Sequence, residues 1–114
     1  MNKLKLYNKA KEFYIFMIMY LNTISKVHTH YKIKLQDNLS LLIENIVHVN
    51  INSGSIRKKY IKECLVNISM IDFYTGIMYE LKIIEGQKYK KILKSMDDLK
   101  SLTYGWLNSE EVKG

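Results

Sequence analysis

The chain has 114 residues, of which 47 % are hydrophobic and 25 % are charged, with five glycines and no proline. This length leaves room for one domain and excludes a second, and the composition excludes an intrinsically disordered chain. The shortage of turn-forming residues disfavours a sandwich or barrel and favours long helices. The net charge of +7 favours a polyanionic partner, although the abundance of Lys, Ile and Asn is also typical of an AT-rich genome.

The single cysteine, Cys64, excludes an intramolecular disulfide and a metal site built from cysteines alone. Lysines precede an apolar run at Phe13–Leu21, as they do in a signal peptide, but the run has nine residues and no small-residue cleavage site follows it. A membrane-spanning helix needs about 20 apolar residues. We therefore expect a reduced, cytoplasmic protein that does not cross a membrane.

The first expected helix covers residues 3–25. Its apolar residues recur at spacings of three and four, which is typical of one helix face: Leu4, Tyr7, Ala10, Tyr14, Met17, Leu21 and Ile24. Further residues widen this face in the second half: Phe13, Phe16, Met19 and Tyr20. A helix that is apolar almost all round is explained either by core burial or by contact with another subunit.

A polar connection containing His28-Thr29-His30 precedes the second expected helix, at residues 35–52. Five apolar residues of this helix follow a 4-3-4-3 spacing, the pattern of a helix packed along a partner: Leu35, Leu39, Leu42, Ile46 and Val49. Gly54 can adopt the left-handed conformation that closes a helix, and Ser55 can cap the next one.

The third expected helix is the longest and covers residues 55–85. Its stripe consists of Ile61, Leu65, Ile68, Ile71, Met78 and Leu81. Cys64 falls beside this stripe, where a small buried residue is wanted. Gly76 costs about 1 kcal/mol relative to Ala inside a helix, and a close helix crossing would explain it.

The fourth expected helix covers residues 87–108, after a stop at Glu85-Gly86-Gln87. Its apolar face consists of Tyr89, Ile92, Met96, Leu99, Leu102 and Trp106. Four amphipathic helices with short connections predict an all-α, up-down-up-down four-helix bundle that occupies the whole chain, residues 1–114.

The sequence offers no arrangement typical of catalysis. No glutamate has a histidine three residues on, as a di-metal centre in a bundle requires, and the Glu44–His48 pair is more simply an exposed contact on one helix face. Cys64 has no histidine near it in sequence, and no nucleophile elbow or Gly-rich phosphate loop is present. We therefore expect no enzymatic activity, no cofactor or metal, and no small-molecule substrate.

Basic residues cluster at the start of the third helix, where positive charge opposes the helix dipole. Helix stability does not explain this placement, whereas an anionic partner does. In an up-down bundle the start of the first helix lies at the same end. The predicted phosphate contacts are therefore Arg57, Lys58, Lys59, Lys62, Lys3, Lys5 and Lys9. Binding through them would be salt-dependent and weakly sequence-selective; the alternative is an ordinary solvated lysine surface.

The opposite end of the bundle is also expected to be basic. It would gather the lysines that open the fourth helix and those that flank the second: Lys88, Lys90, Lys91, Lys94, Lys26, Lys32 and Lys34. Aromatic rings among cations can stack on exposed bases. Tyr60 and Tyr7 are placed for this near the first cluster, although Tyr60 is equally explained as a residue at the edge of the core.

Five segments carry a resemblance to a known family: Tyr31–Asp37, Ile56–Tyr60, Tyr79–Ile84, Lys88-Tyr89 and Gly105-Trp106-Leu107. Tyr31–Asp37 resembles the family's entry into a Leu-rich second helix. Ile56–Tyr60 resembles the basic opening of its third helix, and Tyr79–Ile84 resembles the charged close of that helix. Lys88-Tyr89 and Gly105-Trp106-Leu107 resemble the two ends of its fourth helix. The family comprises the proteins encoded in intervening sequences of bacterial large-subunit ribosomal RNA genes and the accessory variability determinant proteins of diversity-generating retroelements.

The resemblance implies a small non-enzymatic protein that assembles as a homo-pentamer with a basic channel or rim. In the retroelement branch such a protein associates with a reverse transcriptase and its template RNA. We therefore expect an oligomeric bundle that binds nucleic acid, RNA or DNA. The alternative is a structural module that self-associates through the first helix, by Phe13, Phe16 and Tyr20, with no nucleic-acid role. A membrane-surface protein is disfavoured because the core needs the apolar residues.

Overall fold

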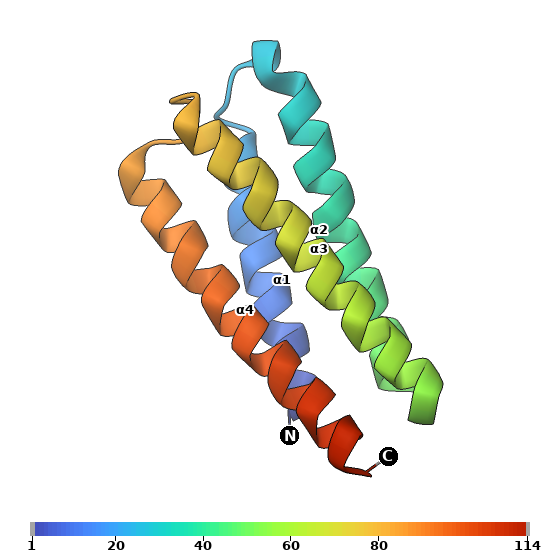
Figure 1. Ribbon diagram of the computed structural model, residues 1–114. Helices are drawn as coiled ribbons and strands as arrows, with labels where there is room; N and C mark the ends of the chain where they lie inside the picture. The colour runs from blue at the N-terminus through green and yellow to red at the C-terminus, as the bar shows by residue number, and fades with distance from the viewer. Residues whose placement is uncertain (1, 114) are drawn as a thin grey trace.

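A computed structural model describes residues 2–113, and the side chains of residues 4–110, as a bundle of four helices with no strand in that part of the chain (Figure 1). The helices are α1 (Asn2–Leu21), α2 (Thr29–Ile51), α3 (Gly54–Glu80) and α4 (Gly86–Lys113), and a short 3₁₀ turn, η1 (Lys26–His28), precedes α2. The bundle measures 46 × 21 × 20 Å. The predicted all-α four-helix architecture is confirmed.

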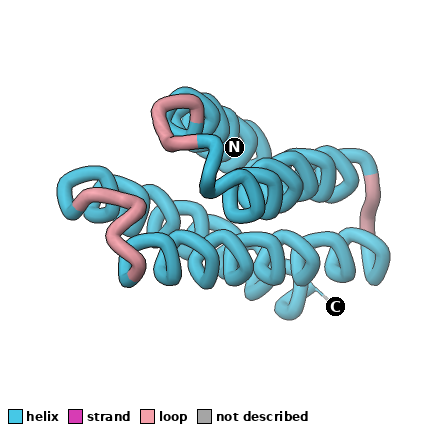
Figure 2. Tube along the Cα trace, turned by 90° about the horizontal axis from the view of Figure 1, so that it is seen from above, coloured by secondary structure: helices cyan, strands magenta, loops and turns pink. Residues whose placement is uncertain are grey.

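Each helix packs against its neighbours around the bundle. α1 and α3 both contact α2 and α4, whereas within the described residues the diagonal pairs α1–α3 and α2–α4 make no close backbone approach. In Figure 2 the loops lie at the two ends of the bundle with the helices between them. The start of α3 therefore shares an end with the start of α1 and the end of α4, near both chain termini (Figure 1).

The core consists of one apolar stripe from each helix. All five residues of the predicted α2 stripe are at most 1 % exposed, which confirms that stripe. α3 buries Ile61, Ile68, Ile71 and Met78, and α4 buries Ile92, Met96, Leu99 and Trp106. The thiol of Cys64 is also buried, and burial raises its pKa to about 12.

The stripe predicted for α1 is wrong over its first turns. Leu4 is 63 % exposed, whereas Leu6 and Phe13 are buried together with Ala10 and Met17. The reason is that α1 packs against both α2 and α4, so its buried face is centred between two neighbours. An unbroken three-and-four spacing that begins at the first leucine does not follow that face.

The connection between α1 and α2 is shorter than predicted. α1 ends at Leu21 rather than at residue 25. Just after this end, the side-chain hydroxyl of Thr23 donates to the carbonyl oxygen of Tyr20 at 2.7 Å. α2 begins at Thr29 rather than at residue 35, so the polar segment at residues 29–34 is helical. Its straight-chain lysines are compatible with a helix, but it lacks the apolar repeat by which a helix is recognised.

The ends of α3 also differ from the prediction. Gly54 has the expected left-handed φ of 62°, but α3 already begins at this residue and its N-cap is Ser53, not Ser55. At the other end α3 stops at Glu80, because Lys82 adopts a φ of 62°. The backbone then closes as a Schellman motif, in which the N–H of Ile83 donates to the carbonyl of Met78 at 2.8 Å.

Candidate nucleic-acid interface

The guanidinium of Arg57, at the start of α3, is held inside the bundle. Its Nε donates to the carbonyl oxygen of Val49 at 3.0 Å, and its Nη1 lies 3.2 Å from Oε1 of Glu110. The side chains of Arg57 and Glu110 are only 17 % and 14 % exposed. Arg57 therefore joins the end of α2 to the end of α4, and the sequence-based interpretation of Arg57 as a phosphate contact overlooks this structural role.

The lysines predicted to accompany Arg57 lie on the surface around it. Lys59 and Lys62 are exposed, and Lys58 is half-buried. The ammonium of Lys59 lies 5.5 Å from the ring centroid of Tyr60. That ring is stacked on His48 at a centroid distance of 4.2 Å, so one of its faces is already covered.

The lysines of α1 lie at the same end of the bundle. Lys5 is exposed, and the ammonium of Lys9 forms an exposed ion pair with Asp98 of α4 at 3.9 Å. The side chain of Lys3 lies outside the described residues. The other expected aromatic residue, Tyr7, lines a separate hollow of about 260 Å³ between α1 and α2. The structure thus brings these cations to one end of the bundle, spread over the starts of α1 and α3.

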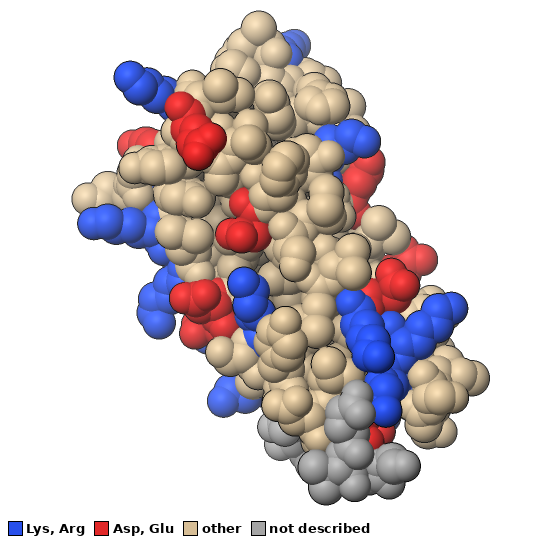
Figure 3. Space-filling model, viewed as in Figure 1, with Lys and Arg blue, Asp and Glu red and all other residues tan. Residues whose placement is uncertain are grey.

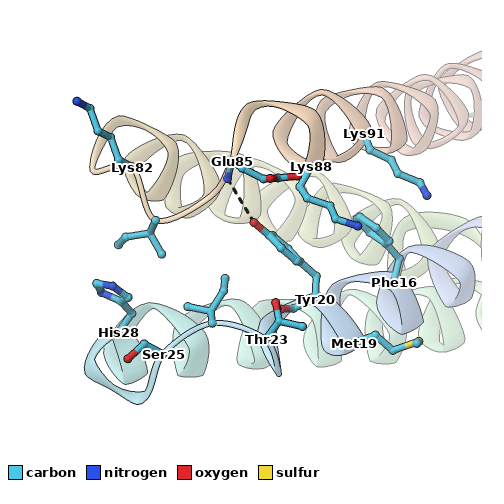
Figure 4. Close-up of a pocket in the computed structure, with 12 residues that line it drawn as sticks. Phe16, Met19, Tyr20, Thr23, Ser25, His28, Lys82, Glu85, Lys88 and Lys91 are labelled. Atoms are coloured by element: carbon cyan, nitrogen blue, oxygen red, sulfur yellow. Dashed lines mark hydrogen bonds between the residues drawn. The ribbon is translucent and has the colours of Figure 1, made fainter.

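A larger groove lies at the opposite end, with a volume of about 820 Å³ (Figure 4). The last two turns of α1 contribute Phe16 and Tyr20, and the first turns of α4 contribute Lys88 and Lys91. Met19 also belongs to α1, and the rest of the lining comes from the α1–α2 and α3–α4 connections: Thr23, Ile24, Ser25, His28, Lys82, Ile83 and Glu85. We call this hollow the lysine–aromatic groove.

Two aromatic rings and two ammonium groups form the centre of the lysine–aromatic groove. The rings of Phe16 and Tyr20 are nearly parallel, with an interplanar angle of 16° and centroids 6.3 Å apart. The ammonium of Lys91 lies 4.8 Å from the Phe16 centroid, and that of Lys88 lies 5.7 Å from both centroids. Figure 4 shows both lysines reaching from α4 across the groove towards these rings.

The wall of the groove is fixed by backbone contacts. The hydroxyl of Tyr20 accepts a hydrogen bond from the backbone N–H of Glu85 at 3.4 Å (Figure 4), which ties the end of α1 to the α3–α4 connection. The ammonium of Lys32 donates to the carbonyl of Ile24 at 2.9 Å and so holds the α1–α2 connection. Lys82 stands at the outer edge with a left-handed backbone, a conformation that costs a non-glycine residue about 1–2 kcal/mol.

A second hollow, of about 280 Å³, extends the groove along the seam between α1 and α4. It shares Phe16 and Lys91 with the first and continues to the Lys9–Asp98 ion pair. The seam therefore runs from the groove towards the end of the bundle that carries Lys5. Lysines along a hollow bind anions, and ring faces beside them accept planar groups.

Sequence reasoning located the lysines of this end but not the groove. Lys88 and Lys91 are three residues apart, and Phe16 and Tyr20 four, so each pair lies on one helix face. That spacing was the available signal, yet only the packing of α1 against α4 shows that the two faces meet. Phe13, predicted with them as a self-association residue, is instead 3 % exposed in the core.

No group of three or more metal-ligating side chains occurs among the described residues, and His48 of the Glu44–His48 pair is occupied by its stack on Tyr60. Within the part of the chain that the structure describes, no helix is long and apolar enough to span a membrane. Comparisons of the chain with protein-family models, with curated proteins and with solved structures find no match.

Proposed function

We propose that this bundle binds single-stranded nucleic acid in the lysine–aromatic groove. The observation that carries the proposal is the position of the Lys88 and Lys91 ammonium groups, 4.8–5.7 Å from the ring centroids of Phe16 and Tyr20, at a hollow of about 820 Å³. A base stacks on an aromatic face while the neighbouring ammonium groups neutralise its phosphates.

The aromatic rings favour a single strand over a duplex. Bases of a duplex are stacked on one another and cannot present a face to a side chain, whereas the bases of a single strand can. Stacking on aromatic side chains contributes about 1–3 kcal/mol per base and tolerates every base. The proposed binding is accordingly weakly sequence-selective.

The lysines at the start of α3 take a secondary place in this proposal. Lys59, Lys62 and Lys5 are exposed and attract a polyanion over a distance. The hollow along the seam between α1 and α4 extends from the groove towards Lys9, but Glu12 and Asp98 also line it. The proposed phosphate contacts are therefore Lys88 and Lys91.

The test is fluorescence anisotropy of a labelled single-stranded oligonucleotide across a range of salt concentrations. The double variant K88A/K91A is expected to lower the affinity and to reduce the slope of log affinity against log salt by about 1.4, at about 0.7 per phosphate contact. The matched control K59A/K62A removes the same charge at the other end and should change the slope less.

A second variant separates stacking from charge. F16L/Y20L keeps apolar bulk and removes both rings, so the affinity should fall by about 5- to 150-fold, as expected for the loss of one stacked base, while the salt slope stays unchanged. Salt-insensitive binding, an absence of binding at low salt, or a larger loss in K59A/K62A than in K88A/K91A would overturn the proposal.

The association with a reverse transcriptase and its template RNA, and the pentameric assembly, remain predictions that rest on the resemblance. Co-purification of the two proteins, with and without ribonuclease, would test the first. Self-association through the first helix also remains a prediction. With Phe13 in the core, such an interface would have to use Phe16 and Tyr20 and would close the groove.

A further inference from the structure

The outward face of α3 carries an apolar patch that the described chain leaves uncovered. Val66 and Phe73 are each 55 % exposed, and Met70 and Ile77 lie half-buried beside them. We call these four residues the α3 stripe.

The neighbouring helices pack on other faces of α3. On one side Tyr60 stacks on His48 of α2. On the other side Tyr79 stacks on Tyr89 of α4, with centroids 4.3 Å apart. The α3 stripe lies between these two contact faces and points to solvent.

Charged residues flank the α3 stripe with opposite sign. Lys59, Val66, Phe73 and Glu80 follow one another at intervals of seven residues, so they lie in one line along the helix, and all four are exposed. Figure 3 shows a mostly uncharged surface over the middle of this side of the molecule, with basic residues gathered at the lower end, where α3 starts, and acidic residues both beside them and nearer the upper end.

We propose that the α3 stripe is the interface between two copies of this chain, crossed antiparallel about a two-fold axis near Ser69 and Met70. Reversal about this point pairs Val66 with Phe73 of the partner subunit and Lys59 with Glu80 of the partner subunit, because both pairs share the same midpoint. Such an interface is isologous, with each contact made twice, and the dimer that it forms is an alternative to the pentamer that the resemblance implies.

The order of charges selects a second copy as the occupant. From Lys59 to Glu80 the line is basic, apolar, apolar and acidic. An identical line that runs in the opposite direction therefore places acid against base and apolar against apolar. A parallel pairing would place Lys59 against Lys59 of the partner subunit, and like charges that face each other are unfavourable. The proposal also accounts for exposed lysines at the start of α3 without an anionic ligand there.

This interface and the lysine–aromatic groove are independent. The groove and its extension lie on the seam between α1 and α4, and α3 is diagonal to α1 in the bundle. Both surfaces can be occupied at once, so failure of the dimer would leave the proposed nucleic-acid binding untouched.

Sedimentation equilibrium of the full chain over a range of concentrations tests the dimer. The expected mass is twice the 13.5 kDa of one chain, and F73E should shift the equilibrium to monomer. The control L41E changes another exposed apolar residue, which is 45 % exposed on α2, and should leave the dimer intact. Circular dichroism of each variant checks that the helices are retained.

Charge reversal tests the antiparallel order. K59E and E80K alone should each weaken the dimer by about three- to tenfold, because two attractive pairs become repulsive. An equimolar mixture of K59E and E80K restores both pairs in a heterodimer, and the double variant K59E/E80K restores them in a homodimer. A monomer or pentamer at all concentrations, an equal loss in L41E, or a mixture no tighter than the single variants would overturn the proposal.

Discussion

Replacement of Arg57 by Met should destabilise the fold, since it removes a side chain that joins the start of α3 to the ends of α2 and α4. The lost contacts are the 3.0 Å hydrogen bond from Nε to the Val49 carbonyl and the 3.2 Å ion pair with Glu110. A hydrogen bond from a charged donor contributes about 1.5–3 kcal/mol, and the carboxylate of Glu110 would be left 14 % exposed without its partner. The expected loss is about 2–3 kcal/mol, or roughly 10 °C in Tm.

Urea and thermal denaturation followed by circular dichroism measure this loss. A double-mutant cycle of R57M with E110Q should give a coupling energy of about 1 kcal/mol. The control K62M removes the same charge from an exposed side chain further along α3 and should cost less than about 0.5 kcal/mol. If R57M were as stable as K62M, or if R57M lowered the salt slope of nucleic-acid binding more than K62M, the structural interpretation of Arg57 would be refuted.

Four further changes have expected outcomes. G105A should raise the free energy of unfolding by about 0.5–1 kcal/mol, because a Cβ at this exposed helical position meets nothing within 4 Å; urea denaturation measures it. G76A should also stabilise, since the added Cβ would only contact the Tyr89 hydroxyl at 3.6 Å, so the crossing is not close enough to require glycine. K82G should stabilise by about 1 kcal/mol by relieving the φ of 62°, whereas K82A should not. Cys64 should react with a thiol reagent only on unfolding. Burial raises the pKa of its thiol from 9.0 to about 12, so between these pH values the unfolded chain binds fewer protons at Cys64 than the folded chain does. The free energy of unfolding should therefore fall from pH 9 to pH 12 in the wild type, and fall less in C64A.

The interior of each helix could be predicted better than its ends. The five-residue α2 stripe was predicted correctly because a strict spacing leaves one choice of buried face. The end of α3 was not, because Lys82 adopts a left-handed backbone at a position where glycine is expected. The gain that offsets this strain is tertiary: the reversal at Lys82 brings Ile84 into the core, where it is 1 % exposed. No local pattern contains that information.

The candidate site was predicted in part. Sequence reasoning found that both ends of the bundle carry lysines. It placed the predicted phosphate contacts at the start of α3, because cations there oppose the helix dipole. The structure supplies a different reason for Arg57, whose partner Glu110 lies at the far end of the chain sequence. A contact between residues so far apart cannot be inferred from one sequence.

By itself the sequence determined the class of the protein. A chain without proline, with four apolar stripes at helical spacing and with Gly54 and Gly86 between the last three of them, can bury those stripes only as a helical bundle. The tertiary structure decided which charged side chains are paired within the bundle, as Arg57 is with Glu110, and which are available to a ligand. Packing of α1 against α4 places Phe16 and Tyr20 beneath Lys88 and Lys91, because the register between two helices is set by the interlocking of their side chains and not by the spacing along either one.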